Sequence, residues 1–158
     1  LLVIDDNSPD GTGRLADTVA SQDSQVHVLH RSQKQGLGRA YLAGFEWGLQ
    51  AGYDALIQMD ADFSHDPKYL PTLISTLDQG ADVAIGSRYV AGGGTVNWGP
   101  VRKLVSRGGS WYARLILGAP IRDFTGGFNG WKAGVLKRLS REGLRSDGYS
   151  FQIELKFR

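Results

Sequence analysis

The residues with the clearest chemical potential are two aspartates, Asp60 and Asp62, which follow the hydrophobic segment 55–59 and are separated only by Ala61. Two carboxylates this close repel each other unless a cation or a strong donor neutralises them. Oxygen ligands of this kind suit Mg²⁺ or Mn²⁺, which proteins often bind through one or two carboxylates together with substrate phosphates. The alternative is a pair of solvated loop aspartates in front of the helix expected from Pro67.

Ser64 and His65 follow this pair directly. The hydroxyl of Ser64 is a candidate for a weak or water-mediated metal ligand. We expect His65 to form hydrogen bonds at the start of the next helix rather than to bind a metal. The chain has no cysteine, so thiolate metal sites and disulfide bonds are excluded.

Two further segments are candidates for nucleotide or phosphate binding. The run 5–11, Asp-Asp-Asn-Ser-Pro-Asp-Gly, is either an ordinary acidic turn or a strand end whose carboxylates accept hydrogen bonds from a base or ribose. Gly36-Leu37-Gly38 opens a predicted helix, where the backbone favours anions. Because Tyr41 stands where a dinucleotide fingerprint has its third glycine, an NAD site is not expected.

Several cations could bind phosphate. Arg88 follows a short predicted strand and is either a bidentate phosphate partner or a structural partner of Asp60 or Asp62. The segment 123–128 is either a loop that returns to the site or a turn that leads into a strand. A stretch without acidic residues suits phosphate groups or an anionic membrane surface, although it could also be a solvated helix face; its cations are Arg102, Lys103, Arg107, Arg114 and Arg122.

The elements that must position these residues alternate along the chain. Hydrophobic runs predict strands at 1–5, 26–29, 55–59 and 82–85. Helical spacing predicts helices at 12–20, with Thr12 as the cap, at 36–52, from 67 onward, and at 101–117, where Trp111 and Tyr112 are expected in the core. This alternation indicates an α/β fold with a mostly parallel sheet. Ligands bind beyond the carboxyl ends of such strands, where the acidic pairs and Arg88 lie.

Bulk composition limits the function classes. With 158 residues and 41% hydrophobic residues, the sequence fits one globular domain. The net charge of +2 is too small to argue for nucleic acid, and no apolar run approaches the roughly 20 residues of a membrane span. The chain opens inside a predicted strand, so we expect residues 1–158 to be a segment of a longer catalytic domain.

Taken in order, these motifs resemble family 2 glycosyltransferases of the GT-A fold, a Rossmann-like α/β architecture. Within that family they are most similar to the dolichol-phosphate or polyprenol-phosphate mannose synthases. The motifs that carry the resemblance are Val3 to Thr12, Gly36 to Gly38, Asp60 to His65, Gly86 to Tyr89, Ser106 to Gly108, Asp123 to Phe128 and Gly148 to Glu154.

The resemblance implies a role for each candidate residue. Ile4 and Asp6 would line the nucleoside pocket, and Asp60 and Ala61 would border the ribose and diphosphate. The metal, Mg²⁺ or Mn²⁺, would bind Asp62, with further oxygens from Asp60 and Ser64. The catalytic residues would be Asp62 and three cations that meet the donor or acceptor phosphate, namely Arg88, Arg102 and Arg107.

The implied reaction is the inverting transfer of mannose from GDP-mannose to a dolichyl or polyprenyl monophosphate. It would take place at the cytoplasmic face of a membrane, with no nucleic acid involved. The family's first strand and any membrane-anchoring domain or subunit would lie outside this segment. Two alternatives remain open: the same reaction with glucose or N-acetylglucosamine from a uridine donor, and a non-catalytic nucleotide-binding module.

Overall fold

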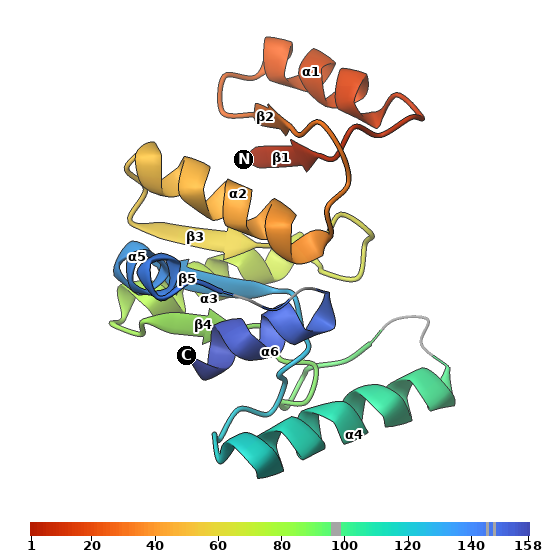
Figure 1. Cartoon of the computed structure of the whole chain (residues 1–158), viewed down its shortest axis with the longest axis vertical. Coiled ribbons are helices and arrows are strands. Elements are labelled where there is room, and N and C mark those ends of the chain that lie inside the picture. The colour runs from red at the N-terminus through yellow and green to blue at the C-terminus, as the bar shows by residue number, and fades with distance from the viewer. Residues whose placement is uncertain (96–98, 145, 147) are drawn as a thin grey trace.

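A computed structural model describes residues 1–95, 99–144, 146 and 148–158. The first half of the chain alternates strands and helices as predicted, within three residues at each boundary (Figure 1). Its elements are β1 (Leu2–Asp5), α1 (Thr12–Gln22), β2 (His27–His30), α2 (Leu37–Gln50) and β3 (Ala55–Gln58). The helix α1 has no side-chain cap; instead, the carboxylate of Asp10 accepts hydrogen bonds from the backbone and hydroxyl of Thr12, so the prediction that Thr12 caps this helix is wrong.

The second half contains two helices that the sequence patterns did not reveal, and a strand that they indicated only through the alternative of a turn at 123–128 that leads into a strand. The predicted segments are a 3-10 turn η1 (Pro67–Tyr69) that continues into α3 (Leu70–Asp78), followed by β4 (Val83–Ile85) and α4 (Pro100–Leu117). The additional elements are β5 (Asn129–Lys132), α5 (Ala133–Glu142) and α6 (Tyr149–Phe157). The strand β5 has the sequence Asn-Gly-Trp-Lys, which lacks the apolar run that marks the other strands.

The strands form two small sheets. β1 and β2 pair in parallel, and β5 lies between β3 and β4 and is antiparallel to both. Because each is antiparallel to β5, β3 and β4 run in the same direction, and Figure 1 shows the arrowheads of β1, β3 and β4 pointing to the same side. The α/β fold class is therefore confirmed, with an inserted antiparallel strand that the expectation of a mostly parallel sheet did not include.

The helix α2 packs on both sheets through two glycines. A Cβ atom at Gly44 would lie 2.6 Å from Cδ1 of Ile4 on β1, and one at Gly48 would lie 2.0 Å from Cδ2 of Leu56 on β3. A side chain at either position would require Ile4 or Leu56 to move, or the helix to shift away from the strand. The two glycines therefore let a single helix fix β1 and β3 relative to each other, which places their carboxyl ends at one edge.

The core has two clusters, one on each face of the three-stranded sheet. The larger cluster lies among α2, β5, α5 and α6, and its buried members are Tyr41, Phe45, Trp131, Leu136, Leu139, Phe151 and Leu155. The smaller one lies under α3 and contains Leu73, Leu77, Ala84 and Phe128. No described helix has the length and hydropathy needed to cross a membrane.

The helix α4 lies at the outside of the molecule (Figure 1), and its large apolar side chains are exposed. Trp111 is 66% exposed and Tyr112 is 63% exposed, so the expectation that they are core residues is wrong. The residues of α4 that the structure buries are small, Ser110 and Ala113. Helical periodicity identified an apolar face correctly, but it could not tell whether that face packs inward.

Candidate active site

The carboxylate of Asp60 is held by two neighbours at the end of β3. The hydroxyl of Tyr41, on α2, donates a hydrogen bond to Oδ1 of Asp60. Burial and this bond raise the pKa of Tyr41 well above its ordinary value, so the phenol keeps its proton and acts as a donor. On the other side, a Cβ atom at Gly127 would lie 3.0 Å from Oδ2 of Asp60, so the 123–128 loop touches the carboxylate through a glycine.

His65 orders the backbone of the same turn. Its Nδ1 accepts a hydrogen bond of 2.9 Å from the backbone N–H of Asp60, and its ring stacks on Phe128 with centroids 5.0 Å apart. Burial lowers the pKa of His65, and the charges of Asp60 and Asp62 oppose this shift only in part. A neutral ring whose Nδ1 accepts a hydrogen bond carries its proton on Nε2. His65 is thus a hydrogen-bonding residue, as predicted.

Asp62 has different surroundings from Asp60. It is exposed, and its Oδ1 accepts hydrogen bonds from the backbone N–H of Ser64 at 3.0 Å and from the Ser64 hydroxyl at 2.5 Å. These bonds hold the pKa of Asp62 below its usual value, so the carboxylate is ionised at neutral pH. Within the described ranges, no group of three or more acidic or histidine side chains is close enough to hold a metal ion.

The predicted nucleoside residues lie at the end of β1. Asp6 forms an ion pair of 2.7 Å with Arg31, a partner that the sequence did not suggest. The side chain of Ile4 packs against α2 at Gly44. Asp5 is buried and accepts a hydrogen bond from the backbone of Ser8. A cavity of about 220 Å³ adjoins this strand end, and its lining includes Asp5, Asn7 and Ser8.

Arg88 is paired with Asp123, not with Asp60 or Asp62, the structural partners that the sequence suggested. Its Nε and one terminal nitrogen donate to the two carboxylate oxygens at 2.7 and 2.6 Å, and the same nitrogen reaches the hydroxyl of Thr125 at 2.7 Å. Asp123 is fully buried. Burial alone would raise the pKa of Asp123, but the hydrogen bonds and charge of Arg88 keep it below its usual value.

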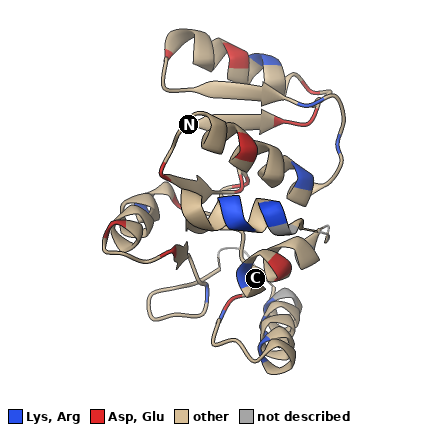
Figure 2. Cartoon of the chain, turned by 60° about the vertical axis from the view of Figure 1, so that its left-hand side comes forward, with Lys and Arg blue, Asp and Glu red and all other residues tan. Residues whose placement is uncertain are grey.

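Tyr89 joins Arg88 to the helix α4. The guanidinium groups of Arg88 and Arg107 lie 5.5 and 5.6 Å from the centre of the Tyr89 ring, and the Tyr89 hydroxyl donates to Ser106 at 2.7 Å. The structure therefore brings two of the three predicted cations around one ring. Arg102 belongs to α4, but its side chain lies outside the described residues. Figure 2 shows basic positions along α4, a helix without acidic residues.

The structure thus gathers the strand-end residues Asp60, Ala61, Asp62 and Ser64 with Arg88 at one edge, and it places Ile4 and Asp6 at the end of a strand in the other sheet. Sequence patterns missed Tyr41, which lies 19 residues from the aspartate that it contacts. They also missed the pairing of Arg88 with Asp123, 35 residues away, because no periodic signal links such positions.

Comparisons with known proteins identify the family of the chain. The chain matches the family model Glycosyl transferase family 2 over residues 1–140. It is 51% identical, over its whole length and 65% of the relative's, to an undecaprenyl-phosphate mannosyltransferase of Micrococcus luteus. It is 52% identical, over its whole length and 60% of the relative's, to a polyprenol monophosphomannose synthase of Mycolicibacterium smegmatis. The chain therefore spans about three fifths of the length of these relatives.

Solved structures show the same fold. A glucosyl-3-phosphoglycerate synthase from Mycobacterium tuberculosis, solved with Mn²⁺, UDP-glucose and phosphoglyceric acid, superposes with a TM-score of 0.68 at 24% identity. The match covers 99% of this chain and 52% of that one. With the family model matching most of the sequence and the GT-A fold shared with these structures, the chain belongs to glycosyltransferase family 2.

Proposed function

We propose that the protein containing this chain transfers mannose from GDP-mannose to a polyprenyl or dolichyl monophosphate, with inversion at the anomeric carbon. The observation that carries the proposal is the pair Asp60 and Asp62 at the end of β3, in a chain whose relatives at 51–52% identity are named as polyprenyl-phosphate mannose transferases. The product is a polyprenyl-phosphate mannose, a sugar donor for glycan or glycolipid assembly.

The donor lies across the ends of β1 and β3 in this proposal. Ile4 and Asp6 border the nucleoside, and Asp60 and Ala61 border the ribose and diphosphate. The surroundings of Asp60 support this role, because Tyr41 donates a hydrogen bond to its carboxylate and the backbone at Gly127 passes close to its other oxygen. A carboxylate that is held in advance loses little freedom when a ribose hydroxyl binds to it.

A divalent cation, Mg²⁺ or Mn²⁺, fits the oxygen atoms beside Asp62. This carboxylate is exposed and ionised, and the Ser64 hydroxyl lies next to its Oδ1, so two oxygens are already adjacent. Asp60 supplies a further carboxylate. When bound, the cation would offset the charge that develops on the leaving diphosphate. Mg²⁺ sites in proteins commonly have few protein ligands and complete their shell with phosphates and water.

The acceptor explains why no general base is needed. A lipid phosphate is ionised at neutral pH, so its oxygen can attack without losing a proton, whereas an alcohol acceptor requires a base. The nearest candidate for a base late in the chain is Asp123, and it is fully buried and committed to Arg88. That observation favours a phosphate acceptor. Arg88, Arg107 and Arg102 would attract its charge, and the first two lie close to the same Tyr89 ring.

The helix α4 is the proposed contact with the membrane, at its cytoplasmic face. Its exposed large apolar residues are Val101, Leu104, Val105, Trp111, Tyr112, Leu115 and Ile116, each between 63% and 72% exposed. Basic residues on the same helix suit anionic lipid headgroups. A helix with an apolar and a basic face lies in the interface of a bilayer, where the acceptor's phosphate is also found. Such a broad apolar face favours lipid over nucleic acid.

A comparison of three nucleotide-sugar donors tests this proposal. The full-length protein is incubated with polyprenyl phosphate and GDP-mannose, UDP-glucose or UDP-N-acetylglucosamine, and the lipid-linked sugar is measured. We expect transfer from GDP-mannose at a rate at least about tenfold above either uridine donor. Preferred transfer from a uridine donor would keep the reaction and replace the sugar. Binding of nucleotides without transfer would indicate a non-catalytic module.

A further inference from the structure

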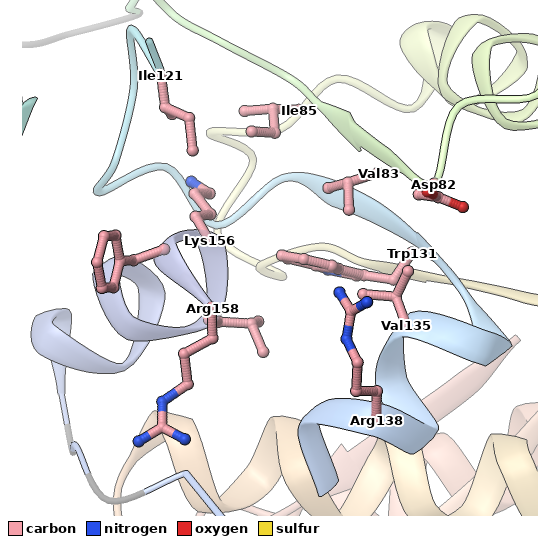
Figure 3. Close-up of a pocket in the computed structure, with 11 residues that line it drawn as sticks. Asp82, Val83, Ile85, Ile121, Trp131, Val135, Arg138, Lys156 and Arg158 are labelled. Carbon is pink, nitrogen blue, oxygen red and sulfur yellow. The ribbon is translucent and has the colours of Figure 1, made fainter. Parts of the chain in front are cut away.

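Lys156 of α6 is a buried cation that the proposed reaction does not use. Only 9% of its surface is exposed, and its Nζ donates to three backbone carbonyls, those of Asp123 at 2.9 Å, Phe124 at 3.3 Å and Gly126 at 2.7 Å. Figure 3 shows its side chain at the wall of a cavity of about 250 Å³, with the guanidinium of Arg158 pointing away from it. All three protons of the ammonium group are used by one loop.

The same loop is held from its other side by Arg88. The Asp123 carboxylate accepts two hydrogen bonds from the Arg88 side chain, one from the Arg88 backbone at 3.0 Å and one from the backbone of Gly126 at 2.9 Å. The amide of Asn129 adds a bond to the Gly126 carbonyl at 3.1 Å. The 123–128 loop is therefore fixed between two cations that come from different parts of the fold.

The position of this loop reaches the candidate active site through Gly127. A Cβ atom at Gly127 would be 3.0 Å from Oδ2 of Asp60, closer than such atoms normally approach, so the loop passes close to the carboxylate at a position where a glycine leaves room for it. Gly127 follows Gly126, whose carbonyl forms the shortest of the three bonds to Lys156. A shift of this carbonyl would move the backbone that supports Asp60.

We propose that Lys156 is a positioning residue: its ammonium group, by holding the carbonyls of Asp123, Phe124 and Gly126, sets the 123–128 loop against Asp60. The inference rests on the proposed function, because it takes Asp60 as a contact of the sugar-nucleotide donor. A neutral amine has only two protons and a lone pair, so on deprotonation one of the three carbonyls loses its donor. The support of Asp60 therefore depends on the charge of Lys156.

The surroundings of Lys156 bring its deprotonation into a pH range that can be tested with the folded protein. Burial lowers the pKa of Lys156 to about 8; Asp123 opposes this shift, and the charge of Arg88 adds to it. The other charged groups that line the adjoining cavity are Asp82 before β4, Arg138 on α5 and Arg158 at the end of α6. Arginines stay charged throughout this range. We therefore expect donor use to weaken as the pH rises through about 8.

Global stability should change in the opposite direction. An unfolded lysine keeps its proton up to a pKa of about 10.5, so between pH 8 and 10.5 the unfolded chain binds more protons than the folded one at this residue. The contribution of Lys156 to the free energy of unfolding therefore rises with pH in that window. Deprotonation of Lys156 therefore cannot cause a loss of activity above pH 8 by unfolding the protein. The opposite pH dependences of activity and stability separate a positioning role from a purely structural one.

The test compares Lys156→Arg, Lys156→Met and the control Lys137→Met in the full-length protein. Lys137 is an exposed lysine on α5. With GDP-mannose varied and polyprenyl phosphate saturating, kcat/KM and the melting temperature are measured from pH 6.5 to 9.5.

We expect the wild type and Lys137→Met to lose about tenfold in kcat/KM above pH 8. Lys156→Met should be about 10- to 100-fold lower at pH 7 and show no further loss. Lys156→Arg, which stays charged, should lack the alkaline loss.

The outcomes separate the two proposals. Absence of transfer by the wild type at every pH would contradict the proposed function. An active wild type, with a Lys156→Met variant that matches Lys137→Met in rate and pH profile, would overturn the role of Lys156. If Lys156→Met does not fold, Lys156→Arg decides the question, and an alkaline loss equal to that of the wild type would overturn the inference.

Discussion

At the scale of single residues, the two aspartates of the Asp-Ala-Asp motif have separate environments. Asp60 is held by Tyr41 and lies against Gly127, whereas Asp62 is exposed and bonded only to Ser64 among the contacts described above. A residue fixed by its neighbours is suited to positioning a substrate. An exposed and ionised carboxylate is suited to binding a cation. We therefore assign the nucleotide to Asp60 and the metal mainly to Asp62.

Asp62→Ala in the full-length protein should lower transfer at least about 100-fold, because loss of a metal ligand removes charge stabilisation at the leaving diphosphate. Its melting temperature should stay close to that of the wild type, since the side chain is exposed. Asp60→Asn should have a milder effect. Asp78→Ala, an exposed position on α3, is the matched control. Wild-type activity that persists with excess EDTA would contradict metal dependence.

Arg88 also stabilises the fold through its ion pair with Asp123, which its sequence position did not indicate. From the sequence alone, Arg88→Lys is expected to keep its melting temperature and lose turnover. Arg88 forms two hydrogen bonds with the carboxylate of buried Asp123, and lysine cannot form both. The melting temperature of Arg88→Lys should therefore fall. We now expect a loss of stability of about 1.5–3 kcal/mol, from one hydrogen bond to a buried charge.

Turnover per folded molecule should fall as well, by about 30- to 150-fold, if Arg88 also acts on phosphate charge. Calorimetry and steady-state kinetics on the same preparation separate the two effects. Asp123→Asn is the companion variant, since it weakens the pair while leaving the arginine in place. Normal turnover per folded molecule in Arg88→Lys would leave Arg88 with a structural role alone.

At the scale of elements, the sequence predicts the helices and strands that have a clear hydrophobic period. These include α2 and α4, whose ends fall within two residues of the predicted ones. Strand β5 was indicated only as the strand that would follow a turn at 123–128, and its bounds were not predicted because Gly130 and polar neighbours interrupt its pattern. It is stabilised by pairing with β3 and β4 on both sides. The predicted carboxyl ends of the strands correctly placed the acidic residues that follow β1 and β3. The contacts between distant segments, such as Tyr41 with Asp60, depend on the packing of α2 and leave no local pattern.

The outward apolar face of α4 should bind vesicles that contain anionic lipid. Replacing Trp111 and Ile116 by serine should weaken co-sedimentation of the full-length protein at least about tenfold, since each large side chain contributes roughly 1.5–3 kcal/mol when buried. Leu15→Ser/Val19→Ser on α1 is the control, because these residues are also exposed and apolar.

Arg102→Glu/Arg107→Glu should weaken the same binding mainly at low salt, where basic residues attract anionic headgroups most strongly. RNA added in place of vesicles should show no dependence on Trp111 and Ile116. Equal vesicle binding by the wild type and both α4 variants would place the membrane contact outside α4.

At the scale of the whole molecule, the fold brings the ends of β1, β3 and β4 to one side, and α2 fixes the first two through Gly44 and Gly48. In the proposed function, the acidic groups at this edge bind the nucleotide and the metal, and the cations beside it bind phosphate. The carboxylate of Asp123 is buried, so it is not accessible to an alcohol that would need a base. We therefore propose that the attacking group is a phosphate that is already ionised.

The acceptor comparison tests that claim most directly. The full-length protein, with GDP-mannose and Mg²⁺ or Mn²⁺, is offered a polyprenyl phosphate and the polyprenol of the same chain length, and the mannosylated lipids are separated and their anomeric configuration determined. We predict transfer to the phosphate with inversion, and a rate for the alcohol at least about 100-fold lower, because Asp123, the candidate base late in the described part of the chain, is buried and bonded to Arg88. Comparable transfer to the alcohol, or a product with retained configuration, would contradict the account.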